Sequence, residues 1–137
     1  MRVMAIDYGD ARTGFAVSDP SATLTGDAWV LHEKSQAAVA EIAISEANAR
    51  DVGVIVVGYP KNMDGTLGLR AEKSEKLAAL LRAQCGLEVV LWDERMTTIS
   101  ASRVLTDTGS FGKKRKKTID AVAASIILDS FLRSRAP

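Results

Sequence analysis

The sequence RVMAIDYGDARTGFAVS, residues 2–18, decides how this chain begins to fold. Two apolar, partly β-branched runs, residues 2–7 and 13–18, flank a polar turn that contains glycine, which is a pattern typical of a β-hairpin. The first run ends on Asp7, a carboxylate at the end of a strand that otherwise suits a core. Because an unpaired carboxylate is expensive to bury, Asp7 needs either a metal ion or a cation such as Arg12 across the turn.

The remaining sequence predicts a sheet that is extended by crossover units. The segment VGVIVVG, residues 52–58, has no polar alternation, as expected for a strand covered on both faces. The expected order predicts an α/β fold, with a mixed central sheet of N-terminal hairpin strands plus parallel strands, flanked by α-helices. The whole chain, residues 1–137, is expected to form a single domain. After the hairpin we expect, in order, a strand over residues 23–31, a helix over 35–50 capped by Ser35, the strand 52–58, a helix ended by Gly86, a strand over 87–92, a short helix from Thr97 or Thr98, and a last helix from Thr118.

Composition narrows the class of protein and its surroundings. The chain has 47% hydrophobic and 26% charged residues, which is ordinary for a soluble globular protein. Its net charge of +1 means that nucleic-acid binding must come from a local basic patch. The single cysteine, Cys85, cannot form an internal disulfide, and no apolar run reaches membrane-spanning length. We therefore expect a cytoplasmic protein with no membrane partner.

Acidic residues recur at the ends of the predicted elements. Asp93 and Glu94 follow a strand, as Asp7 does, and Asp120 lies in the first turn expected for the last helix. Ligands gather at the carboxyl ends of parallel strands, so Asp7 and one of the 93/94 pair can converge there, and Asp120 can join them. Three carboxylates repel one another unless a cation lies among them, and a ligand set of oxygens alone suits Mg²⁺ or Mn²⁺. Such a site predicts metal-assisted hydrolysis of a phosphodiester.

An ordinary structural role also accounts for each acid taken singly. Asp120, two residues after Thr118, compensates a helix dipole. Glu94 would form a surface ion pair of little energetic value with the adjacent Arg95. Asp7 pairs with Arg12.

Polar and basic residues near these acids are predicted to contact a phosphate backbone. The run GKKRKK, residues 112–117, adds five positive charges in a loop expected before the last helix. A charge run is usually a solvated loop, yet beside a carboxylate site it favours contact with a polyanion. The predicted nucleic-acid-binding set is Arg12, Lys61, Asn62, Arg70, Arg95, Lys113, Lys114, Arg115, Lys116 and Lys117.

Four ordered blocks make the chain similar to the YqgF family, also called RuvX-like. The blocks are DYGDARTGFAVSD (7–19), VVGYPKNMDGTLG (56–68), LWDERMTTISA (91–101) and IDAVAASIIL (119–128). The resemblance implies a ribonuclease H-like fold and nucleolytic cleavage with Mg²⁺ or Mn²⁺. It also implies that Asp7, Glu94 and Asp120 are the catalytic, metal-binding acids. Asp93 could be exchanged with Glu94, whose longer side chain is better able to turn back toward the site.

The resemblance leaves two substrates open. Members of the family have been proposed to cut Holliday-junction-like DNA and to trim the 5′ end of precursor 16S ribosomal RNA. Junction cleavage needs two symmetric sites and hence a homodimer, whereas trimming is open to a monomer.

Two other classes of function are compatible with the sequence. One is a nucleic-acid-binding module without catalysis, in which the acids are structural. The other is a nucleotide-binding phosphotransfer domain of the actin and sugar-kinase type, because DYGDARTG, residues 7–14, also resembles the first phosphate-binding turn of those proteins. That fold closes two domains around ATP, and this chain has room for one.

Overall fold

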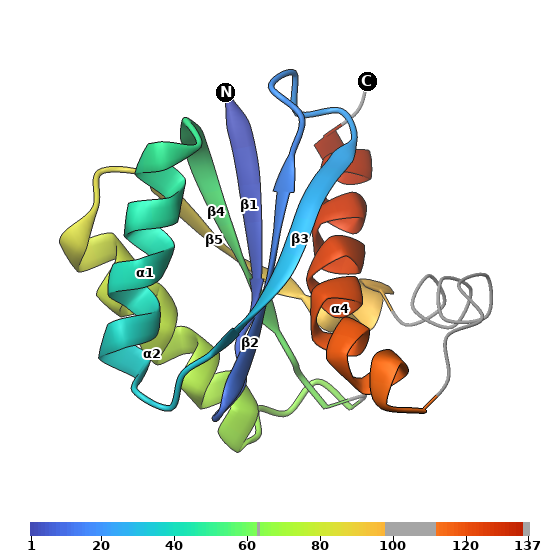
Figure 1. Ribbon diagram of the computed structural model, residues 1–137. Helices are drawn as coiled ribbons and strands as arrows, with labels where there is room; N and C mark the ends of the chain where they lie inside the picture. Colours follow the sequence, from blue (N-terminus) through green and yellow to red (C-terminus); the bar gives the residue numbers. More distant parts are fainter. Residues whose placement is uncertain (63, 98–111, 136–137) are drawn as a thin grey trace.

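The computed structural model describes residues 1–62, 64–97 and 112–135, and it shows a five-stranded mixed sheet between two layers of helix (Figure 1). The strand order is β3-β2-β1-β4-β5. The antiparallel pairs β1–β2 and β2–β3 continue the N-terminal hairpin, while β4 pairs parallel with both β1 and β5. The predicted mixed α/β sheet is confirmed. The strands are β1 (Arg2–Asp7), β2 (Arg12–Ser18), β3 (Thr25–His32), β4 (Val52–Tyr59) and β5 (Glu88–Asp93).

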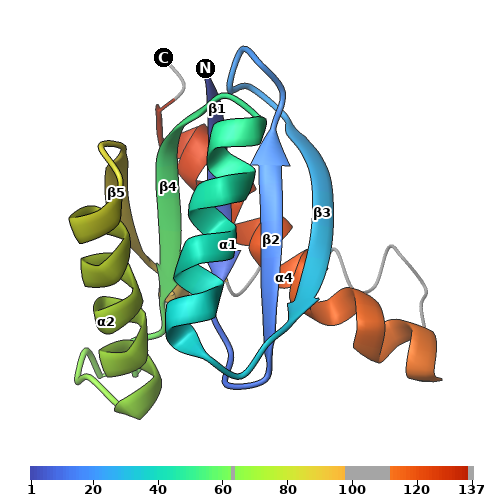
Figure 2. The ribbon, with the colours of Figure 1, turned by 60° about the vertical axis from the view of Figure 1, so that its left-hand side comes forward.

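Helices cover both faces of the sheet. Helices α1 (Gln36–Ala49) and α2 (Leu69–Gln84) lie side by side on one face, and Figure 2 shows them in front of the strands, with α4 (Gly112–Arg135) behind. Because side chains alternate along a strand, the core divides into two clusters. Ile6 lies in the cluster under α1 and α2, and Ala5 lies in the cluster under α4. The same alternation directs Asp7 toward α4.

Helix α1 begins where the sequence predicts. The hydroxyl oxygen of Ser35 accepts a hydrogen bond from the backbone N–H of Ala38 at 3.2 Å, which satisfies one of the free amides of the first turn. Val39, Ala43 and Ala47 are buried against the sheet. The cap and the apolar stripe together fix the position of this helix.

Removal of the cap is expected to destabilise the protein. Ser35→Ala leaves the Ala38 amide without its acceptor and should lower the free energy of unfolding by about 1 kcal/mol in urea titrations. Ser35→Asn keeps an acceptor at the same place and should stay close to wild type. An equal loss in both variants would show that the cap is not the cause.

Helix α4 begins at Gly112, earlier than the start predicted at Thr118. The predicted loop at residues 112–117 is therefore wrong. Lys and Arg favour helices nearly as well as Leu does, so a basic run continues a helix readily. Asp120 lies beyond the first turn of α4, and dipole compensation does not account for it. The short helix expected after Thr97 or Thr98 falls outside the described residues.

Among the helices that the structure describes, none is both long and apolar enough to cross a membrane.

Candidate active site

The end of β1 brings Asp7 close to Asp120. Asp7 lies opposite Gly14 in the β1–β2 ladder. A Cβ atom on Gly14 would stand 1.9 Å from the backbone oxygen of Asp120, so α4 crosses the sheet in direct backbone contact there. Only glycine leaves room for this approach. Glycine at this position therefore lets the backbone of α4 at Asp120 pack directly on β2, opposite Asp7 in the ladder.

Glu94 reaches the same face from β5. It opens the short 3-10 helix η1 (Glu94–Thr97), directly after the strand. Ile6 pairs with Val57, which puts Gly58 of β4 at the level of Asp7. A Cβ atom on Gly58 would stand 3.1 Å from Oε2 of Glu94. The bare backbone at Gly58 thus leaves the space in which the Glu94 carboxylate lies.

Asp7 is affected electrostatically by both of the other acids. Burial raises the pKa of Asp7 to about 7, and the charges of Glu94 and Asp120 add to the shift, while Arg70 opposes it. Burial also raises the pKa of Glu94, again against the charge of Arg70. Carboxyl groups whose pKa is raised by burial and by other acids are typical of functional sites that gather negative charge.

Asp120 is held by Arg12. Nε of Arg12 lies 3.3 Å from Oδ2 of Asp120. The alternative in which Arg12 pairs with Asp7 is therefore wrong, since the guanidinium turns to α4. Within the described residues, no three His, Cys, Asp or Glu side chains gather closely enough to hold a metal ion. The acids share one end of the sheet as hard oxygen donors of the type that Mg²⁺ and Mn²⁺ prefer, with Asp120 turned to Arg12.

Asp93 has a different role from its neighbour. Arg95 donates to it from Nη2 at 2.6 Å and from the backbone N–H at 3.0 Å, and these bonds lower the pKa of Asp93. The suggested ion pair between Glu94 and Arg95 is replaced by this one. Asp93 thus anchors the turn after β5, and Glu94 is the acid of this pair whose charge acts on Asp7.

Comparison with known proteins shows which family this chain belongs to. Residues 1–134 match the family described as "RuvX: Holliday junction resolvase". The chain belongs to the RuvX family. A relative from Halothermothrix orenii is 42% identical over 132 residues, covering 96% of this chain and 94% of its own length. One from Acetivibrio thermocellus is 40% identical over 137 residues, covering 98% and 97%. Both carry the name "Putative pre-16S rRNA nuclease".

Solved structures show that this RuvX-family chain shares its fold with junction resolvases. The structure of T. thermophilus RuvC in complex with a Holliday junction substrate aligns with a TM-score of 0.66 at 11% identity, over 98% of this chain and 96% of that one. The Fowlpox virus resolvase in complex with Holliday junction DNA aligns with a TM-score of 0.63 at 11% identity, over the whole of both chains. The predicted ribonuclease H-like fold is confirmed.

The loop between β4 and α2 lies at the same edge of this RuvX-family sheet as Glu94. It is braced from within, because Nδ2 of Asn62 donates to Oγ1 of Thr66 at 2.9 Å. The ammonium group of Lys61 lies 5.4 Å from the centre of the Tyr59 ring. Arg70, in the first turn of α2, brings its charge to Asp7 and Glu94. The amide of Asn62 is thus committed to the loop, whereas Arg70 belongs to the acidic site.

The basic run lies on the same helix as Asp120. Residues 112–117 form the first turns of α4, directly before the acid along the chain. The predicted contacts Lys113, Lys114, Arg115, Lys116 and Lys117 have their backbones there, and their side chains fall outside what the structure describes.

A hollow of about 510 Å³ beside Arg12 was missed by sequence reasoning. Ala11, Arg12, His32, Glu33 and Lys34 line it. The β2–β3 register, in which Arg12 pairs with His32, brings these residues together. No local pattern marks Lys34 as a neighbour of the site, because only strand pairing places it there.

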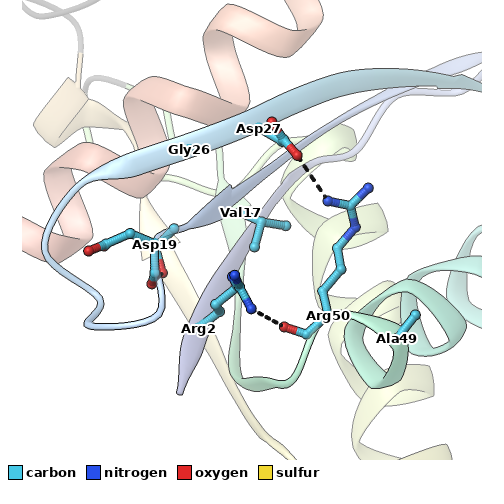
Figure 3. Close-up of a pocket in the computed structure, with 8 residues that line it drawn as sticks. Arg2, Val17, Asp19, Gly26, Asp27, Ala49 and Arg50 are labelled. Atoms are coloured by element: carbon cyan, nitrogen blue, oxygen red, sulfur yellow. Dashed lines mark hydrogen bonds and ion pairs between the residues drawn. The ribbon is translucent and has the colours of Figure 1, made fainter.

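A second pocket, of about 420 Å³, lies at the opposite end of the sheet (Figure 3). Arg50 spans it, with Nη1 3.3 Å from Asp27 and the guanidinium 4.2 Å above the Trp29 ring. Arg2 donates to the backbone oxygen of Arg50 at 3.1 Å. Asp19 accepts backbone N–H groups of its own loop, and these bonds lower its pKa. The charged groups of this pocket therefore brace α1, β1 and β3.

Proposed function

We propose that this RuvX-family protein is a metal-dependent nuclease that hydrolyses phosphodiester bonds of nucleic acid. The observation that supports the proposal is that Asp7, Glu94 and Asp120 all lie at one end of one sheet face, where burial and the charges of the other two acids raise the pKa of Asp7 to about 7. Buried carboxylates such as Asp7 and Glu94, whose charged forms are disfavoured, support a site for a divalent cation. Family membership and the resolvase-like fold support the same activity.

The three acids are proposed to hold Mg²⁺ or Mn²⁺. When bound, such an ion lowers the pKa of a water molecule and stabilises the leaving oxygen. Arg70 balances part of the negative charge of Asp7 and Glu94. We propose that the remaining predicted contacts bind the phosphate backbone: Arg12, Lys61, Asn62, Arg95 and the run Lys113 to Lys117.

The proposed substrate is the 5′ end of precursor 16S ribosomal RNA. Relatives at 40% identity and above are named for a nuclease of pre-16S rRNA, whereas the two junction-bound resolvase structures are 11% identical and show the fold. Cleavage of Holliday-junction-like DNA is the second candidate, because this chain aligns over nearly the full length of those resolvases. We propose a cytoplasmic location, with a monomer sufficient for trimming and a homodimer required for junction cleavage.

Parallel cleavage assays test the proposal. Labelled precursor RNA and a four-way DNA junction are incubated with the full chain at increasing Mg²⁺ and Mn²⁺. We expect metal-dependent cleavage of the RNA, a rate that falls below about one-thousandth of wild type in Glu94→Gln, and most of the rate retained in the matched Asp93→Asn. If Asp93→Asn lost the cleavage rate and Glu94→Gln kept it, Asp93 would take the place of Glu94 in the proposed ligand set. Absence of cleavage of both substrates at every metal concentration would leave a binding module without catalysis.

A further inference from the structure

Arg12 stands between the acids and the surface to which a phosphate backbone is proposed to bind. It is the first residue of β2, and its Nε lies 3.3 Å from Oδ2 of Asp120 on α4. The Arg12 side chain is 50% exposed, whereas the Asp120 side chain is 20% exposed. Arg12 is therefore the solvent-side half of the pair, within reach of a ligand that approaches from outside.

The contact between the two groups is an ion pair without a hydrogen bond. Oδ2 of Asp120 is buried, and no donor in the described part of the chain hydrogen-bonds to it. A buried carboxylate oxygen normally accepts at least one hydrogen bond, because leaving it unsatisfied is unfavourable. Charge alone holds this oxygen to Arg12. A ligand that accepts hydrogen bonds from the guanidinium can therefore replace Asp120 as the partner of Arg12.

Arg12 also lines the hollow that it shares with His32, Glu33 and Lys34. Glu33 is engaged, since its Oε2 accepts the backbone N–H groups of Lys34 and Ser35 at 2.9 and 3.2 Å. Arg12 and Lys34 are exposed cations at the edge of this hollow. Two such cations suit a phosphodiester oxygen, and the guanidinium offers donors in the planar arrangement that phosphate accepts.

We propose that Arg12 is a reversible guard of the metal site. In the metal-free protein it holds Asp120, and nucleic-acid phosphate in the hollow draws the guanidinium away, which frees Asp120 to join Asp7 and Glu94. The inference rests on the proposed nuclease function and adds an order of binding events: nucleic acid binds first, and only then do all three acids come together at the metal site. Because binding linkage is reciprocal, nucleic acid and metal ion strengthen each other's binding.

Arg12→Gln removes the guard and keeps all three acids. In calorimetry without nucleic acid, Mn²⁺ should bind the variant about fivefold more tightly than wild type, because Asp120 is no longer held. In EDTA, a labelled single-stranded RNA should bind the variant more weakly, with the slope of log affinity against log salt reduced in magnitude by about 0.7, the change for one lost phosphate contact. The matched control is Arg133→Gln, which breaks an exposed pair with Asp129 at 3.0 Å and should change neither affinity.

A double-mutant cycle tests the exchange without metal. Asp120→Asn releases Arg12, so RNA binding in EDTA should tighten, and the gain should be absent when Arg12→Gln is also present. An equal gain in both backgrounds would show that Asp120 acts only by repelling phosphate and would overturn the guard.

The sign of the Mn²⁺ result separates the guard from a structural role. If Arg12 merely orients Asp120 for metal, Arg12→Gln weakens Mn²⁺ binding, which overturns the inference. If Arg12→Gln leaves the Mn²⁺ affinity unchanged while the wild type shows metal-dependent cleavage, the inference about Arg12 is overturned. The proposed nuclease function would still stand. Mn²⁺ binding that is equal in wild type and Asp7→Asn instead overturns the proposed function itself.

Discussion

Asp7→Asn is expected to abolish cleavage and, in the absence of metal, to make the folded protein more stable at pH 8. The cleavage rate should fall below about one-thousandth of wild type, because the acid at the end of β1 is lost from the proposed ligand set. The gain in stability has a separate cause. Burial disfavours the charged Asp7 carboxylate, and the charges of Glu94 and Asp120 add to this, so the neutral amide of Asn removes both costs.

The pH dependence of the stability gain follows from the direction of the shift. The pKa of Asp7 is about 7 in the folded protein against an ordinary value of 3.8, so between these values the folded state binds more protons than the unfolded state. The contribution of Asp7 to stability is therefore fully present below pH 4 and is lost as the pH rises to 7. Urea unfolding in EDTA should show the variant more stable than wild type by at most about 4 kcal/mol at pH 8, and no different at pH 4.

Metal addition supplies the control for this prediction. Mg²⁺ at pH 8 should raise the melting temperature of wild type, because the ion binds the folded state alone, and should have a smaller effect on Asp7→Asn. An Asn variant that is less stable than wild type at pH 8 in EDTA would contradict the electrostatic account of the site.

Gly14→Ala should displace α4 and inactivate the protein. The added Cβ atom would stand 1.9 Å from the backbone oxygen of Asp120 and 2.6 Å from its carbonyl carbon. Backbone atoms in the middle of a helix cannot move aside as a flexible side chain does, so the whole helix must shift. We expect the free energy of unfolding to fall by about 3 kcal/mol, measured in urea, with loss of cleavage in the fraction that still folds.

Gly86→Ala is the matched control for this overpacking. A Cβ atom on Gly86, which follows α2, would meet no atom within 4 Å, and its φ lies outside the left-handed region. We expect this variant to be as stable as wild type or slightly more stable, since alanine restricts the unfolded chain more than glycine does. A similar loss in both variants would mean that backbone freedom, and not the contact with α4, makes glycine necessary at position 14.

Most of the fold was predictable because local patterns determine it. The run from Val52 is continuously apolar because both faces of β4 are covered, and Ser35 caps α1 through a bond to a residue three positions away. The start of α4 was not predictable in this way. A basic run has the propensity of a helix and the composition of a solvated loop, so sequence alone does not decide between them.

The sequence indicates which acids to propose as ligands, but it does not predict which cations they pair with. Positions at strand ends identified Asp7 and Glu94, since parallel strands bring their carboxyl ends to one edge. The pairing of Arg12 with Asp120 depends on how α4 crosses β2, which no short stretch of sequence records. The commitment of Asp93 to Arg95 likewise required the side-chain geometry after β5.

The proposed ligand set is divided between two bodies, because Asp7 and Glu94 belong to the sheet and its direct continuation whereas Asp120 is carried by α4. Sliding α4 along its own axis would withdraw one acid and leave the other two in place. The close backbone contact between Gly14 and Asp120 opposes such a displacement of α4. The position of α4 along its own axis thus decides whether all three proposed ligands lie at the same end of the sheet.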